Sequence, residues 1–185
     1  ENGVYAKKFN KKDKEATPLK LTIITTKSMQ LVAVLIRDYL KNAGVEANLK
    51  IVSLSELQQN YLRTKNYNAI LIGESYTTSI DPYVFWHGAA IKDPGLNLAL
   101  YNNRKVNKIL EASRQITDPV KRAQKLEDFQ KLVLGDAPAV FLYSPNYIYA
   151  VKNTVKNINL VKLAIPSNRF AKINEWYIET ERIWR

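Results

Sequence analysis

In residues 19–72, segments with the apolar spacing of β-strands alternate with segments that have the apolar spacing of α-helices. This alternation restricts the fold more than any other feature of the sequence. Segments 19–25, 45–53 and 67–72 are short and rich in β-branched or alternating apolar residues, as strands are. Between them, segments 28–43 and 55–64 repeat apolar residues at helical spacing. This order favours parallel strands joined by right-handed crossovers, so the sequence predicts an α/β fold with a mixed sheet flanked by helices.

Local signals predict where these first two helices begin and end. Ser28 is expected to cap the first helix, and Gly44 to end it because glycine readily adopts positive φ. Ser55 and Gln58 have the spacing of a capping box at the start of the second helix. The first helix is expected to bury one broad apolar stripe: Leu31, Leu35, Tyr39 and Ala43, widened by Val32, Ile36 and Leu40.

The second half of the chain predicts a helical hairpin followed by two strands. Asn103 is expected to start a helix that runs to Ile116, and Asp118 and Pro119 to start another that ends at Gly135. The second helix is expected to bury Val120, Ala123, Leu126, Phe129 and Val133. Strands are predicted over 139–143 and 147–151.

Residues 80–88 follow the third predicted strand and carry an aromatic cluster. Asp81-Pro82 is typical of a turn or helix start, and Tyr83, Phe85 and Trp86 follow it directly. In open α/β sheets, ligands bind beyond the carboxyl ends of the strands. We therefore expect this loop to face a ligand, although Phe85 is also typical of a buried core residue.

The formal net charge of +11, from 28 basic and 17 acidic residues, raises a second function class. A basic module that binds nucleic acid or an anionic membrane surface is the alternative interpretation. The lysines are spread along the chain, the densest group lies in a polar arm at residues 1–18, and no nucleic-acid-binding motif surrounds it. This pattern favours solvated surface, and no nucleic-acid partner is expected.

The side-chain inventory excludes several kinds of chemistry. The chain has no cysteine, so disulfides and thiolate metal sites are excluded, and no metal or other cofactor is expected. A hydrolase would have to use His87, the single histidine, with Ser75 or Ser79, but neither serine has a nucleophile-elbow pattern. We therefore expect no catalytic residues and no enzyme. No apolar run is long enough to span a bilayer, and the first residue, Glu rather than Met, indicates a mature product or an excised fragment.

An ordered series of short motifs resembles the C-terminal half of family 5 extracellular solute-binding proteins, and the similarity runs from about Leu19 onward. The motifs are Asp81-Pro-Tyr-Val-Phe-Trp-His87, Asn97, Tyr101-Asn-Asn103, Val106-Asn107, Asp118-Pro-Val-Lys-Arg122, Ala137-Pro-Ala-Val-Phe-Leu-Tyr143, Arg169-Phe170 and Glu175-Trp-Tyr-Ile178. This family comprises the oligopeptide, dipeptide and nickel receptors of bacterial ABC importers.

The resemblance implies a domain division and a function. Residues 19–154 would form one periplasmic-binding-protein-like lobe after the arm at 1–18, and residues 155–185 would pack on an N-terminal lobe that this sequence lacks. The whole receptor would capture peptides or similar small solutes outside the cytoplasm and deliver them to an ABC permease in the membrane.

The loop and the resemblance together select the expected ligand-binding residues: Tyr76, Thr78, Asp81, Tyr83, Trp86 and Asn97. Peptide receptors of the family carry an acid for the peptide's α-amino group shortly before the Asp-Pro or Glu-Pro step. Counting back three residues from Asp81 gives Thr78, which is not an acid, so the resemblance does not carry that contact over. A cleft residue at Trp86 would be partly exposed in the isolated lobe, whereas a core residue would be buried.

Overall fold

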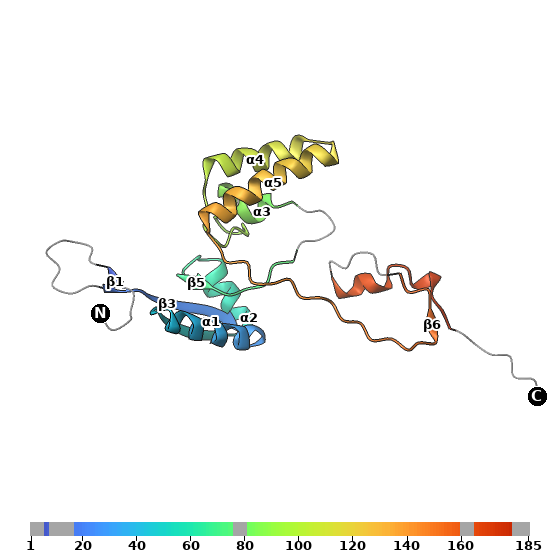
Figure 1. Ribbon diagram of the computed structural model, residues 1–185, viewed down its shortest axis with the longest axis horizontal. Coiled ribbons are helices and arrows are strands. Elements are labelled where there is room, and N and C mark those ends of the chain that lie inside the picture. The colour runs from blue at the N-terminus through green and yellow to red at the C-terminus, as the bar shows by residue number, and fades with distance from the viewer. Residues whose placement is uncertain (1–5, 8–16, 76–80, 160–164, 179–185) are drawn as a thin grey trace, which may run out of the picture. The chain divides into compact units, whose positions relative to one another are not determined.

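The computed structural model describes residues 6–7, 17–75, 81–159 and 165–178 (Figure 1). The chain divides into two compact units. The described residues within 1–73 and 82–138 form the first unit, and those within 74–81 and 139–185 form the second. The boundaries expected from the resemblance, at residues 18/19 and 154/155, remain a prediction about a larger protein.

A three-stranded parallel sheet organises the first part of the chain. The central strand β3 (Lys20–Thr26) pairs in parallel with β4 (Glu46–Val52) on one side and with β5 (Ala69–Ile70) on the other. Ile23 lies opposite Leu49 and Ala69 in the two registers. The predicted parallel α/β unit is therefore confirmed. A separate antiparallel pair joins β1 (Ala6–Lys7) to β2 (Thr17–Pro18).

Helix α1 (Gln30–Asn42) follows the short turn η1 (Lys27–Met29) and packs on the sheet. The predicted stripe is wrong in part, because Leu31, Leu35 and Tyr39 are 81%, 57% and 71% exposed. Two apolar rows run along α1, and only one of them can face the sheet. The row that packs on buried Ile23 and Leu71 consists of Met29, Val32, Ala33, Ile36 and Leu40.

The ends of α1 show one confirmed and one wrong prediction. Gly44 has a φ of 79°, as expected of a residue that ends a helix. Ser28 does not cap the helix; its hydroxyl lies 2.8 Å from that of Thr26, and Met29 occupies the N-cap without a side-chain bond.

A second helical segment packs on other residues of the sheet, Ile24 and Val52. It comprises α2 (Leu54–Glu56), capped by Ser53, and continues as η2 (Leu57–Leu62). The Ser53 hydroxyl accepts the Glu56 amide at 3.1 Å, so the helix begins two residues before the predicted Ser55 cap. Leu57 is buried with Ile24 and Val52.

The later helices of this unit follow the prediction closely. The short α3 (Tyr83–Trp86) and η3 (Gly88–Ala90) precede the hairpin of α4 (Arg104–Gln115) and α5 (Pro119–Asp136). Asn103 and Asp118 cap the hairpin helices, as predicted: their side chains accept the amides of Lys105 and Val120 at 2.9 and 2.8 Å. The buried hydrophobic side chains of the hairpin are Val106, Leu110, Phe129 and Val133.

Several details of α5 differ from the prediction. Val120 is 67% exposed, Ala123 is also exposed and Leu126 is half-buried, so the buried residues of α5 are Phe129 and Val133 in its second half. The helix continues through Gly135, and Ala137 adopts the left-handed conformation at its end, with a φ of 48°.

The second unit contains little regular structure. Strands β6 (Val155–Lys156) and β7 (Tyr177–Ile178) pair antiparallel, and the turns η4 (Pro166–Phe170) and η5 (Ile173–Glu175) lie between them in sequence. Arg169 donates to the Tyr147 hydroxyl at 2.7 Å and lies over the ring of Phe170, 4.3 Å from its centroid.

The strands predicted over 139–143 and 147–151 are not formed. These residues form neither helix nor strand, and several of their large apolar side chains are exposed, among them Val140 at 83% and Ile148 at 89%. A strand is stabilised by hydrogen bonds to a neighbour, and among the described residues this segment pairs with none. The composition favours a strand, but composition alone does not supply a partner. No helix among the described residues has the length and apolar character required to cross a membrane.

Candidate functional site

The segment that the sequence singles out forms α3 and the loop that follows it. Pro82 occupies the N-cap of α3, and its carbonyl accepts the amides of Phe85 and Trp86 at 3.1 and 3.0 Å. Proline suits this position because its missing N–H would have no helical partner in a first turn. The predicted helix start at Asp81-Pro82 is therefore confirmed, and it determines where the following rings lie.

Trp86 belongs to the core of the first unit. Its side chain is 6% exposed, and its ring meets those of Tyr101 and Phe129, with both centroid distances 6.4 Å. Of the two alternatives for Trp86, its burial agrees with a core residue, because Phe129 of the α4–α5 hairpin packs against its ring.

Asn97 is fully buried and holds the loop together. Its amide nitrogen donates to the carbonyls of His87 and Tyr101 at 3.1 and 2.8 Å, and its amide oxygen accepts the Tyr101 N–H at 3.1 Å. A buried amide is stable only when its polar atoms are bonded in this way. The observed role of Asn97 is thus to shape the loop between α3 and α4.

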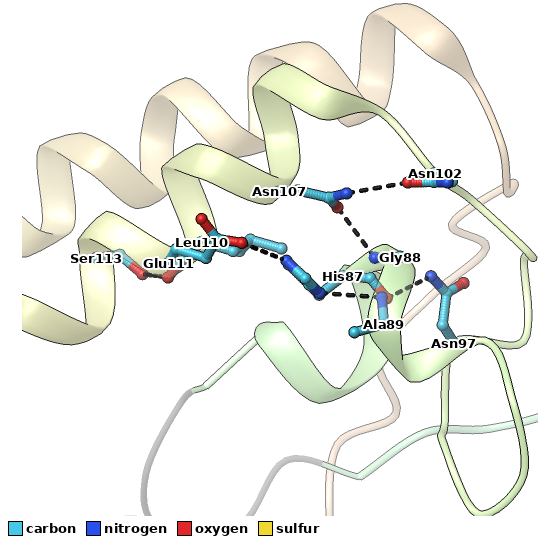
Figure 2. A network of polar contacts seen from close by, with 9 residues as sticks. All are labelled: His87, Gly88, Ala89, Asn97, Asn102, Asn107, Leu110, Glu111 and Ser113. Carbon is cyan, nitrogen blue, oxygen red and sulfur yellow. Dashed lines mark hydrogen bonds and ion pairs between the residues drawn. The ribbon is translucent and has the colours of Figure 1, made fainter.

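His87 lies at the centre of a polar network between this loop and α4 (Figure 2). It is 7% exposed; its Nδ1 accepts the Ala89 amide, and its Nε2 bonds Glu111 Oε1, both at 3.0 Å. The next amide, that of Gly88, donates to Asn107 Oδ1 at 3.0 Å. The sequence favours a packed or hydrogen-bonded His87 over a catalytic one, but it does not identify the partners in this network. A signal was available, since Glu111 and Asn107 are one turn apart on a predicted helix.

Tyr83 lies at the edge of a small apolar pocket. Its ring stacks on His87 with a centroid distance of 4.1 Å, and the Arg114 guanidinium lies over it at 4.4 Å. These contacts hold the ring in one orientation. The pocket has a volume of about 280 Å³ and is lined by Tyr83, Val84, Ala89, Ala90, Pro94, Gly95 and Leu96.

Gly95 lines the same pocket and lies against the backbone of Ala90. A Cβ at Gly95 would lie 2.0 Å from the carbonyl oxygen of Ala90, so no larger residue fits without moving the backbone. The loop is tied to the sheet region by Lys65, which donates to the Gly95 carbonyl at 2.9 Å, and by Tyr67, which donates to the Leu98 carbonyl at 2.6 Å.

Three predicted site residues precede α3 in the sequence: Tyr76, Thr78 and Asp81. Asp81 is half-buried, and Tyr76 and Thr78 lie outside the described residues. Of the six predicted residues, Tyr83 lines the apolar pocket, whereas Trp86 and Asn97 are buried and do not line it.

A second, open hollow lies between the start of α4 and the end of α5. It has a volume of about 720 Å³ and is lined by Asn103, Arg104, Lys105, Lys108, Leu132 and Asp136. Three cations against one carboxylate give it a positive charge. The sequence analysis did not find it, although Lys105 and Lys108 have the spacing of neighbours on a helix.

Beside this hollow, a hydrogen bond between Tyr101 and Asp136 shifts the pKa values of both side chains. Tyr101 Oη and Asn103 Nδ2 donate to Asp136 Oδ2 at 2.6 and 2.7 Å. Burial, together with the bond to Asp136, raises the pKa of Tyr101 to about 12. The bonds from Tyr101 and Asn103 lower the pKa of Asp136. Among the described residues, no group of three or more His, Cys, Asp or Glu side chains could hold a metal ion.

Comparison with known proteins relates the chain to solute-binding proteins, although no protein-family model matches it. It is 26% identical over 170 residues to the oligopeptide-binding protein AppA of Bacillus subtilis, covering 90% of this chain and 30% of that protein. It is 32% identical over 113 residues to the probable D,D-dipeptide-binding periplasmic protein DdpA of Escherichia coli, covering 57% of this chain and 22% of that protein. The chain therefore spans less than a third of the length of either curated relative.

Solved structures agree with these relatives. The structure of Bacillus subtilis AppA in complex with a nonapeptide superposes with a TM-score of 0.72 at 26% identity, covering 95% of this chain and 35% of that one. The periplasmic binding protein DppA of Helicobacter pylori, in complex with the peptide STSA, gives a TM-score of 0.68 at 23% identity, covering 88% of this chain and 31% of that one, which supports the fold.

These comparisons confirm the predicted resemblance, the α/β fold of periplasmic binding proteins and the extracytoplasmic location that the resemblance implies. The relatives are named as binding proteins rather than enzymes. In sequence and fold, the chain is similar to part of the oligopeptide-binding protein AppA and, in sequence, to part of the probable D,D-dipeptide-binding protein DdpA.

Proposed function

We propose that this chain is the C-terminal lobe of an extracytoplasmic receptor that captures peptides or similar small solutes and delivers them to an ABC importer. The observation that carries the proposal is the match to AppA, which covers 95% of this chain but 35% of the AppA structure. Such coverage is what one lobe of a two-lobed receptor would give. The other lobe of the same receptor and a membrane permease are the partners in this proposal.

The structure supports a ligand-facing role for the region around α3. Tyr83 is held between His87 and Arg114 at the edge of an apolar pocket, and Val84 and Leu96 on the same pocket are 39% and 48% exposed. A rigid aromatic edge beside exposed apolar surface suits the side chain of a bound peptide. We propose that the ligand-binding residues are Tyr76, Thr78, Asp81, Tyr83, Trp86 and Asn97, and that the buried Trp86 and Asn97 act by holding the structure around Tyr83.

The proposal contains no catalytic step and no nucleic-acid partner. His87 is engaged by a backbone amide and by Glu111, so it has no serine partner among its observed contacts. Binding rather than turnover also agrees with the names of the relatives.

Affinity measurements on the longer receptor that contains this chain test the proposal. Tyr83→Ala should weaken binding of a peptide ligand at least about fivefold, the loss of a moderate aromatic contact. Tyr39→Ala, a change at a 71% exposed position on α1, serves as the control and should leave affinity unchanged. Unchanged affinity in Tyr83→Ala would refute the site, and a longer receptor that binds no peptide or other small solute would refute the function.

A further inference from the structure

The imidazole of His87 caps the short helical turn η3. Its Nδ1 accepts the Ala89 amide at 3.0 Å, and Ala89 is the second residue of that turn. Asn, Asp, Ser or Thr usually makes this bond at an N-cap. A histidine can make it only while Nδ1 carries a lone pair, which requires the neutral tautomer with its proton on Nε2.

The rest of the network agrees with that tautomer. Nε2 lies 3.0 Å from Glu111 Oε1, so the Nε2–H donates to a carboxylate while Nδ1 accepts from the backbone (Figure 2). Both ring nitrogens are therefore engaged, one as donor and one as acceptor, in a site that is 7% exposed.

The groups that face the ring come from two helices. Glu111 approaches from α4, and Tyr83 of α3 stacks on the ring at 4.1 Å with an interplanar angle of 12°. Arg114 of α4 lies beyond Tyr83, over the face of the phenol ring. Asn97 bonds the His87 carbonyl rather than its ring.

We propose that His87 is a proton-sensitive cap, which holds the turn Gly88–Ala90 while neutral and releases it when protonated. A proton on Nδ1 turns this acceptor into a donor that points at another N–H, so the bond to Ala89 is lost. The bond from Nε2 to Glu111 persists and gains the attraction of an ion pair.

The released turn is one wall of the apolar pocket beside Tyr83. Ala89 and Ala90 line that pocket, and the Ala90 carbonyl accepts the Asn97 amide at 3.0 Å. Loss of the cap therefore loosens the pocket wall and its connection to the buried Asn97. The proposal concerns the order of this turn and holds whether or not the proposed receptor function is correct.

Nuclear magnetic resonance of the ¹⁵N-labelled chain tests the tautomer and the cap together. Above pH 8, the ring nitrogen shifts of His87 should show a proton on Nε2 alone. As the ring becomes an imidazolium, the exchange protection of the Ala89 amide, corrected for intrinsic rates, should fall by roughly five- to tenfold. A proton on Nδ1 above pH 8, or unchanged Ala89 protection in the imidazolium form, would overturn the proposal.

Variants of His87 and Glu111 distinguish protonation of His87 from other effects of low pH on the protection of the Ala89 amide. In His87→Asn, the amide oxygen can cap the turn at any pH, so Ala89 should stay protected from pH 8 to pH 5. His87→Ala has no cap and should leave Ala89 unprotected throughout. In Glu111→Gln, the acceptor for Nε2–H remains but the charge is removed, so the transition should move to lower pH. Loss of Ala89 protection in His87→Asn with the same pH dependence as in the wild-type chain would show that His87 is not the group that titrates.

Discussion

The hydroxyl of Tyr101 donates a 2.6 Å hydrogen bond to Oδ2 of Asp136, and this bond joins the loop before α4 to the last residue of α5. The two residues are 35 positions apart in sequence. Their bond closes the end of the helical hairpin at which the basic hollow lies, and it makes hairpin stability depend on pH.

Replacing Tyr101 by Phe should lower the melting temperature at pH 7 and remove part of this pH dependence. The pKa of Tyr101 in the folded chain is raised from an ordinary value of 10.0 to about 12. Its contribution is therefore complete below pH 10 and is lost as the pH rises through about 12. Melting curves from pH 7 to 12 should show the gap between wild type and Tyr101→Phe closing over this interval. Tyr177→Phe, at a 60% exposed position, should show no gap.

The same bond should be visible at acid pH through Asp136. Hydrogen bonds from Tyr101 and Asn103 lower the pKa of Asp136, so the carboxylate contributes stability above its unfolded-state value, and that contribution is lost as the pH falls through the folded-state value. Carbon-13 titration of the Asp136 carboxyl should give a higher pKa in Tyr101→Phe than in the wild-type chain. An unchanged value would mean that the bond contributes nothing in solution.

Truncating Trp86 should destabilise the fold rather than act on a ligand alone. Its ring is buried against Tyr101 and Phe129, so Trp86→Ala should cost about 3–5 kcal/mol of unfolding free energy. Denaturant unfolding measures this loss. Tyr39→Ala, at a 71% exposed position, should change the same quantity by less than about 0.5 kcal/mol. Equal effects of the two changes would contradict the packing described for Trp86.

Replacement by alanine should lower the stability of the fold at Gly95 and raise it at Gly135. A Cβ at Gly95 would lie 2.0 Å from the Ala90 carbonyl oxygen, so Gly95→Ala should destabilise by about 1–3 kcal/mol and disturb the pocket wall. Gly135 lies inside α5 with nothing within 4 Å of its Cβ position, so Gly135→Ala should stabilise by about 0.5–1 kcal/mol. Thermal melts of both variants beside the wild-type chain test the pair, and a shift of the same sign in both would contradict the structure.

Several helix ends were predicted correctly because their signals are local, whereas the local signals at Ser28, Ser55 and Gly135 were misleading. The caps at Asn103 and Asp118 and the end of α1 at Gly44 depend on residues within one turn, and all three are confirmed. The parallel order of β3, β4 and β5 follows from the sequence of elements alone.

Features that depend on tertiary partners could not be predicted in this way. Leu31 and Val32 belong to two apolar rows on the same helix, and only the position of the sheet decides that the row of Val32 is the packed one. Residues 139–151 have strand-like composition but pair with no strand in the part of the chain that is described. The bonds of Asn97 join groups up to 10 positions apart through a loop whose path no periodicity indicates.

Titration of one peptide set against the isolated 185-residue chain and against the longer receptor that contains it tests the central claim most directly. As one lobe of the proposed receptor, the chain would supply about half of the ligand contacts, so calorimetry should give a Kd near or above about 1 mM for the isolated chain, equivalent to about −4 kcal/mol. The longer receptor should bind members of the same set at least about a hundredfold more tightly, a difference of about 2.7 kcal/mol. Micromolar binding by the isolated monomeric chain, or no gain in the longer receptor, would contradict the account of this chain as one lobe of a two-lobed solute receptor.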